Sequence, residues 1–140
     1  MGKINVGRLV LSGIIIAVIV DVVEGIMNGW VLAQRWTEAM AALGQPPLSV
    51  TGVVLFNIYG LVIGLSAAWI YVGFRPRFNP GHMTAILAAL TTWVLGYFLP
   101  YLSLAIMGVS TSLMVTVGIV GLIEIVVATL IGAYFYQEAA

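Results

Sequence analysis

Three polar side chains share one face of the first long apolar run of this chain. Asp21, Glu24 and Asn28 are spaced i, i+3 and i+7, which places them on one side of a helix. A further acid, Glu124, lies in the middle of the last apolar run. Carboxyl groups in such runs can bind a proton or a cation, or can join neighbouring helices through hydrogen bonds as neutral acids.

These acids have no basic residue near them in the sequence. All five Lys and Arg residues lie outside the apolar runs, and desolvation disfavours the ionised form of a carboxyl group. Three hypotheses follow. The acids are protonated and hydrogen-bonded to Asn28, Asn57 or Thr; they bind a cation or relay protons; or another subunit supplies the positive partner. We predict that they are mostly protonated and structural.

Other site chemistries find little support. The chain has no Cys and one His, His82, so a transition-metal site built from protein ligands alone is not expected. One His at the start of an apolar run gives no Ser-His-Asp constellation, and no Gly-rich stretch opens a strand–turn–helix. The basic residues form no patch that would bind nucleic acid. We therefore expect no catalytic residue, no metal and no cofactor, and we expect that the chain is not an enzyme.

The elements that carry the acids follow from composition. The 140 residues are 62% hydrophobic and 7% charged, and the mean hydropathy is +1.15. Four apolar segments, at about 9–32, 48–74, 83–107 and 113–136, each reach the ~20 residues that a helix needs to cross a bilayer. The predicted fold class is all-α: a polytopic four-transmembrane-helix bundle forming a single integral membrane domain over 1–140, with a short interfacial helix at about 33–43.

Basic residues predict the topology. Lys3, Arg8, Arg75 and Arg77 lie on one side of the predicted membrane, and only Arg35 lies on the other. The positive-inside rule then places both termini in the cytoplasm.

Depth along the predicted spans suggests which polar groups meet. Asp21 and Glu124 both lie near the middle of their spans, and Glu24 and Asn57 lie at a similar depth farther out. We therefore predict one polar layer inside the bundle, with Asp21 near Glu124 and Glu24 near Asn57. Pro100 predicts a kink or unwinding near Leu99 in the third span.

The insertion energy of the first span indicates that its acids face the bundle interior. Its fourteen Leu, Ile and Val residues favour insertion by roughly 6 kcal/mol, and two central acids oppose it by about the same amount. If both acids were ionised and faced lipid, this span alone would be marginal.

Small residues recur on the same face as the acids. With Asp21 they repeat every four residues along the first span, and a similar series runs through the second span. Such spacing lets helix backbones approach closely. The predicted helix-packing residues are Gly13, Ala17, Gly25 and Gly29 in the first span, and Gly60, Gly64 and Ala68 in the second.

The chain resembles small uncharacterised four-span membrane proteins of bacteria that are grouped as domains of unknown function. The resemblance covers the whole chain as a pattern: the acid-bearing first span, the outer segment "AQRW", the Gly-rich "NIYGLVIGLSAAW" and the aromatic "GAYFYQE". It implies no activity. The expected location is the bacterial cytoplasmic (inner) membrane.

The preferred functional expectation is a small non-catalytic subunit or scaffold that packs laterally in a larger membrane complex. Its expected partners are the lipid bilayer and other membrane-protein subunits, or further copies of itself. One alternative is a proton- or cation-coupled small carrier or channel that uses Asp21, Glu24 and Glu124. The other is an accessory subunit that holds a pigment or lipid against Trp93, Tyr97 and His82.

Overall fold

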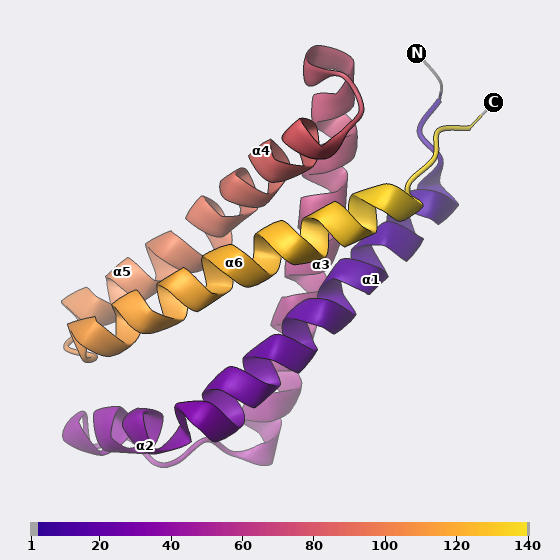
Figure 1. Ribbon diagram of the computed structural model, residues 1–140. Coiled ribbons are helices and arrows are strands. Elements are labelled where there is room, and N and C mark those ends of the chain that lie inside the picture. The colour runs from indigo at the N-terminus through magenta and orange to yellow at the C-terminus, as the bar shows by residue number, and fades with distance from the viewer. Residues whose placement is uncertain (1–2, 140) are drawn as a thin grey trace.

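The computed structural model describes residues 3–139 and is an all-helical bundle (Figure 1). Four helical segments within these residues are long and apolar enough to cross a membrane: Val6–Val31, Val50–Phe78, His82–Ile106 and Thr111–Phe135. These segments identify the chain as an integral membrane protein, and their limits lie within four residues of the predicted spans. Outside the helices, the described residues contain one isolated β-bridge, between Lys3 and Ala139.

The first span is interrupted at its end and the third near its middle. The first consists of α1 (Val6–Ile26) and a π-helical turn, η1 (Met27–Val31). The third consists of α4 (His82–Trp93), a second π-helical turn, η2 (Val94–Phe98), and α5 (Leu99–Ile106). The second and fourth spans are the continuous helices α3 (Val50–Phe78) and α6 (Thr111–Phe135). The predicted short helix is present as α2 (Ala33–Ala42).

Side-chain caps fix where three of these helices begin. The side chains of Asn5, Ser49 and Ser110 each accept a hydrogen bond from the backbone N–H three residues later, which satisfies a donor that the first helical turn leaves free. The helix α3 continues to Phe78, beyond the predicted end of the second span. Arg75 and Arg77 therefore lie in its last turn, where positive charge is favourable.

The unwinding predicted near Leu99 takes the form of η2. Pro100 has no N–H, so the carbonyl of Gly96, four residues earlier, lacks its usual helical donor. The Tyr59 hydroxyl of α3 donates a hydrogen bond to that carbonyl instead. A π-helical turn before a proline is a known way to absorb such a defect, and here a neighbouring helix supplies the missing donor.

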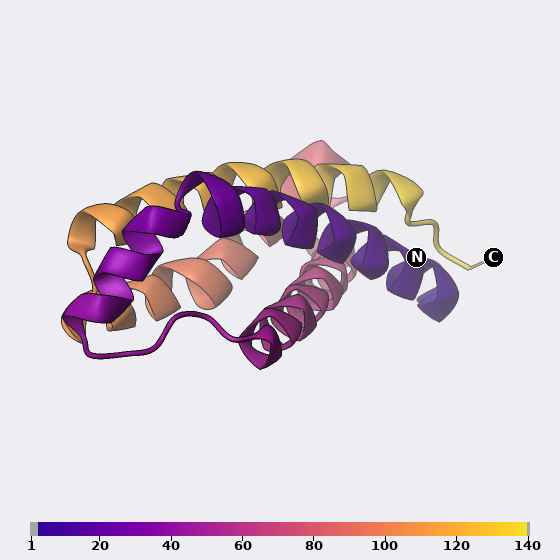
Figure 2. The ribbon, with the colours of Figure 1, turned by 90° about the horizontal axis from the view of Figure 1, so that it is seen from below.

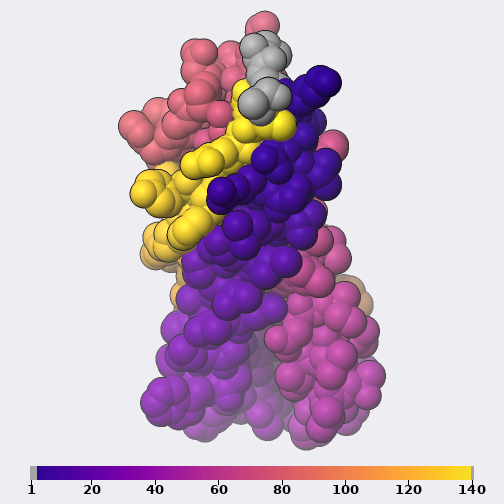
Figure 3. Space-filling model, turned by 90° about the vertical axis from the view of Figure 1, so that its right-hand side faces the viewer, coloured from indigo at the N-terminus to yellow at the C-terminus, as the bar shows by residue number. Residues whose placement is uncertain are grey.

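Two ends of the bundle differ in what they contain. Both termini and the turn between α3 and α4 lie at one end, whereas α2 and the turn between α5 and α6 lie at the other (Figure 1). At the terminal end, the last turns of α6 cross over the first half of α1 (Figure 3). The guanidinium of Arg75 lies 4.9 Å from the ring centroid of Tyr136 and its Nε lies 3.2 Å from Glu138 Oε1, which ties the C-terminal segment to α3.

Candidate functional site

The first half of α1 packs against α3 and α6 through small residues. A Cβ atom on Gly64 of α3 would collide with the carbonyl of Gly13 and the backbone of Ala17, so the two helices touch directly. On the other side, Ser12 Oγ donates to the carbonyl of Gly132 in α6 at 2.8 Å. Ala68 is fully buried in the same core. These are the close contacts expected for a small-residue stripe in a membrane protein.

The stripe does not continue along the second half of the span. Gly25 and Gly29 are exposed, and a Cβ atom added to either would meet nothing within 4 Å. Gly60 is buried, but the space that a side chain would fill there is occupied by the carboxyl group of Asp21. Close contacts are therefore seen at four of the predicted packing residues: Gly13, Ala17, Gly64 and Ala68. Gly25 and Gly29 face outwards, because α1 and α3 cross and then diverge (Figure 1).

The polar groups meet beyond this crossing, in a different pairing from the one that depth predicts. Glu24 and Glu124 lie within hydrogen-bonding range of each other. Asn57 is exposed on α3, where its Nδ2 donates to the carbonyl of Val53 at 2.8 Å. Asp21 lies against α3 at Gly60, and it is close enough to Glu24 and Glu124 to act on both carboxyl groups electrostatically. Depth matching ignores direction around the helix. Side chains three residues apart share a face but still differ by about 60° around the axis, which is enough for Asp21 to point to α3 while Glu24 points to α6.

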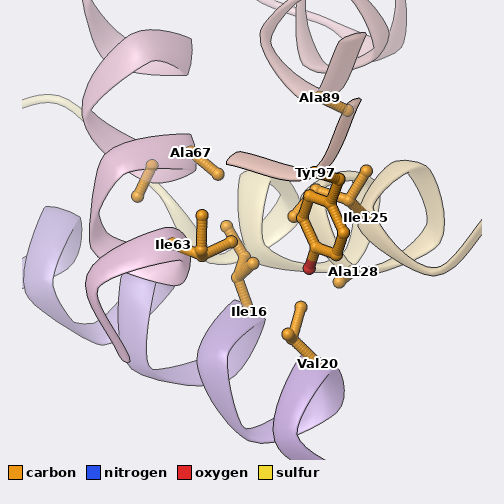
Figure 4. Packing of buried hydrophobic residues seen from close by; sticks show 9 residues of the cluster. Ile16, Val20, Ile63, Ala67, Ala89, Tyr97, Ile125 and Ala128 are labelled. Atoms are coloured by element: carbon orange, nitrogen blue, oxygen red, sulfur yellow. The ribbon is translucent and has the colours of Figure 1, made fainter. Parts of the chain in front are cut away.

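Glu124 is buried, with 5% of its surface exposed, and is held by an aromatic hydroxyl. Tyr97, which belongs to η2, donates its hydroxyl hydrogen to Glu124 Oε1 at 2.9 Å. Figure 4 shows the Tyr97 ring among buried aliphatic side chains such as Ile125 and Val20, with its oxygen directed towards α1. The Glu124 carboxyl group is therefore fixed at one oxygen by a donor from another helix.

Glu24 is held in a similar way from the opposite side. Asn28, in η1, donates from Nδ2 to Glu24 Oε2. Trp36, in α2, donates from Nε1 to Asn28 Oδ1 at 2.8 Å. Three residues from three successive elements thus form one chain of hydrogen bonds that ends on the Glu24 carboxyl group.

Two carboxyl oxygens are left over in the centre of this network. Glu24 Oε1 and Glu124 Oε2 are buried and have no hydrogen-bond donor among residues 3–139. Each carboxyl group already accepts a hydrogen bond at its other oxygen. One proton placed between the two carboxyl groups would satisfy both remaining oxygens, because a protonated acid donates where an ionised one only accepts.

Electrostatics also disfavours two ionised carboxyl groups at this place. Two carboxylates about 4 Å apart repel each other by about 4 kcal/mol even in a moderately polar environment, and a membrane-embedded site offers less screening. The nearest other titratable side chains are Asp21, Tyr59, Tyr97 and Tyr101, none of which is a cation. No cluster of three or more His, Cys, Asp or Glu side chains suited to a metal ion occurs among the described residues.

The helix α2 covers the site from the non-terminal end of the bundle. Figure 2 shows α2 beside the start of α6. Leu32 and Ala39 pack on Leu113 and Val117 of α6. Arg35 donates from Nη2 to Ser112 Oγ at 2.9 Å and from Nη1 to Thr116 Oγ1 at 3.3 Å, which ties α2 to the same helix.

Of the residues named for a pigment or lipid site, Trp93 and Tyr97 share one buried cluster, whereas His82 lies apart from them. Tyr97 is buried in the polar network, and Trp93 donates from Nε1 to the carbonyl of Gly118 at 2.9 Å. His82 is exposed at the start of α4, eleven residues away from Trp93. A groove of about 690 Å³ does exist between α3 and α4, but it is lined mainly by apolar side chains such as Ile63 and Leu95 and does not include any of the acids.

No protein-family model, curated protein or solved structure matches this chain. The resemblance to small four-span bacterial membrane proteins therefore stays a prediction.

Proposed function

We propose that this integral membrane protein is a small proton-coupled carrier or channel whose proton-binding group is the Glu24–Glu124 pair. The single observation that supports this role is the pair of facing carboxyl groups, each with one oxygen held by a donor and one buried oxygen without any. Such a pair in a low-dielectric setting binds one proton strongly and resists full ionisation. Intramembrane acids arranged in this way are typical of proton pathways.

The π-helical turns give the pair a way to respond when it gains or loses a proton. Asn28 lies in η1 and Tyr97 lies in η2, so each carboxyl group is hydrogen-bonded to an irregular turn rather than to a regular helix. π-helical turns are frequent at functional sites, where the backbone is less rigidly specified. A change in charge at the pair can therefore move two spans.

The scaffold role preferred from the sequence is the second candidate. Two features favour it. The acids link α1, α6 and η2 through their side chains. Neither the groove near Ile63 nor the smaller groove near Ser112 is lined by Glu24 or Glu124. In this role the pair would remain protonated at all times, and hydrogen bonds worth about 1 kcal/mol each would hold the helices together.

Infrared difference spectroscopy on the purified protein in lipid separates the two roles. Protonated carboxyl groups have a distinct carbonyl-stretch band, and a proton-exchanging pair predicts that this band decreases as the buffer changes from mildly acidic to alkaline. Glu24→Gln and Glu124→Gln should each remove the titrating band, and Glu38→Gln on α2 is the matched control that leaves it unchanged. A band that stays constant across the whole pH range would support the scaffold role and contradict the carrier.

The same variants also separate the roles in cells. A carrier predicts that Glu124→Gln assembles normally in the membrane and loses all activity, because Gln keeps the hydrogen bonding of a neutral acid but cannot release a proton. A scaffold predicts that both assembly and activity survive this change, and that Asp21→Leu weakens assembly more than Asp21→Asn. Membrane abundance and growth phenotype should be measured side by side.

A further inference from the structure

The orientation of the Asn28 amide is determined by Trp36. An indole N–H can only donate a hydrogen bond, so the Asn28 atom that faces it must be the carbonyl oxygen. The amide nitrogen is then directed at Glu24 Oε2, which must act as an acceptor. Without Trp36, the amide could turn over and present its oxygen to Glu24 instead.

This orientation determines which Glu24 oxygen is available to share a proton with Glu124. Because Oε2 accepts from Asn28, the proton that Glu24 carries or shares must lie on Oε1, which has no other partner within residues 3–139. Tyr97 has the same effect on Glu124, because it donates to Oε1 and leaves Oε2 without a donor among the described residues. Trp36 and Tyr97 together direct the two unpartnered oxygens to the same place.

Neither Trp36 nor Asn28 can carry protons between Glu24 and the end of the bundle. The indole N–H does not ionise under ordinary conditions, and a neutral amide has no proton to give up readily. The chain Trp36–Asn28–Glu24 therefore transmits position and not protons. What it transmits is the position of α2, because Trp36 packs in the cluster that covers α6 together with Ala39 of α2 and Leu32, the residue just before this helix.

We propose that Trp36 is a positioning residue that holds Glu24 against Glu124 through Asn28, and that α2 is thereby a lid whose seating is coupled to the carboxyl pair. The coupling extends the proposed proton-binding role of the pair, and the two claims have separate tests. When α2 is seated, Asn28 is oriented and the pair is closed. When α2 lifts from Leu113 and Val117, Asn28 is free to turn and Glu24 loses its fixed donor.

Two tryptophan variants provide a matched comparison. Trp36→Phe and Trp93→Phe each keep an aromatic ring and remove one indole hydrogen bond, at 2.8 and 2.9 Å respectively. Only the first bond leads to Glu24. The carbonyl-stretch band of the carboxyl pair should therefore change position in Trp36→Phe and remain unchanged in Trp93→Phe.

Lid opening has its own readout, which does not depend on protonation. The chain has no cysteine, so a single introduced thiol reports its own accessibility without background. Val117→Cys lies under α2, with 1% of the native side chain exposed, and Thr129→Cys lies fully buried near the opposite end of α6. A water-soluble maleimide should label Val117→Cys roughly fivefold faster in the Trp36→Phe background, because that is the factor expected for losing one hydrogen bond. It should label Thr129→Cys at the same rate in both backgrounds.

Asn28→Leu is the second variant in case Trp36→Phe does not fold. It breaks the same chain while leaving the Trp36 ring on α6, and it should give the same faster labelling and the same shift of the band. Unchanged labelling and an unchanged band in both folded variants would overturn the lid proposal. A band that does not titrate in the wild-type protein would instead overturn the proton-binding role, and the labelling result would still decide whether α2 is coupled to the acids.

Discussion

In the first half of α1, small and aliphatic side chains bring the helix into direct backbone contact with α3, whereas the second half carries a polar network and ends in a π-helical turn. The crossing at Gly13 and Gly64 has no room for a single added carbon atom. About three turns beyond Gly13 on the same helix, Gly25 has open space beside it. The comparison shows that one span can provide a rigid crossing at one end and an adaptable site at the other.

The same contrast separates α3 and α6 from the third span. The two continuous helices provide Gly64 and Glu124 from regular backbone, whereas the third span provides Tyr97 from η2. Pro100 creates this irregular turn, and the Tyr59 hydroxyl satisfies the carbonyl that it leaves free. Irregular backbone in a membrane is tolerated where protein groups supply the missing bonds, and here it also directs a tyrosine at the acid pair.

The largest expected effect tests the rigid half of α1. Gly64→Ala should lower the free energy of unfolding by about 1–3 kcal/mol, because the new methyl group meets backbone atoms that cannot move aside. Gly25→Ala, in the same bundle, should be neutral or stabilising by up to about 1 kcal/mol, since alanine favours helix and the space is open. Thermal unfolding in detergent, followed by circular dichroism, measures both. Equal effects of the two changes would remove the contrast between the two halves.

A smaller effect tests the polar half. Tyr97→Phe should lower the free energy of unfolding by about 1 kcal/mol, because it leaves Glu124 Oε1 without its donor. Tyr101 packs edge-on against Tyr97 with ring centroids 6.1 Å apart. Tyr101→Phe should change stability by less than about 0.5 kcal/mol, since its hydroxyl makes no hydrogen bond within the described residues. If Tyr101→Phe proves the more damaging change, the assignment of the donor to Tyr97 is wrong.

The smallest effect tests the origin of the second π-helical turn. Pro100→Ala restores a backbone N–H that can reach the carbonyl of Gly96. Tyr59→Phe should therefore cost about 1 kcal/mol in the wild-type background and close to nothing in Pro100→Ala. A double-mutant cycle on unfolding free energies measures the coupling. Strictly additive changes would show that the tyrosine and the proline act independently.

Much of the fold could be predicted from the sequence, because apolar length and helix-capping residues are local properties. The four spans and the short helix after the first one follow from such signals. The choice of partners within the bundle could not be predicted in the same way. Depth along a span paired Glu24 with Asn57, and only the direction of each side chain around its helix pairs Glu24 with Glu124.

Two members of the network were visible in the sequence without their role. Tyr97 lies three residues before Pro100, and a proline within a span could have directed attention to it. Trp36 gave no such signal, because its bond to Asn28 depends on the turn between η1 and α2. The topology relative to the membrane remains a prediction, and reporters fused at the C-terminus and within residues 33–47 should report cytoplasm and outside, respectively.

The proposed proton-binding role requires that Glu24 and Glu124 face each other inside the bundle and share a proton. Solid-state NMR on protein in lipid, with ¹³C in the side-chain carboxyl groups of its glutamates, tests it directly. The labelled positions are Glu24, Glu38, Glu124 and Glu138. A shared proton predicts a carboxyl–carboxyl cross-peak between Glu24 and Glu124 that is absent in Glu124→Gln, with a chemical shift typical of a protonated acid for at least one of the two. Two ionised carboxyl signals without a cross-peak would contradict it.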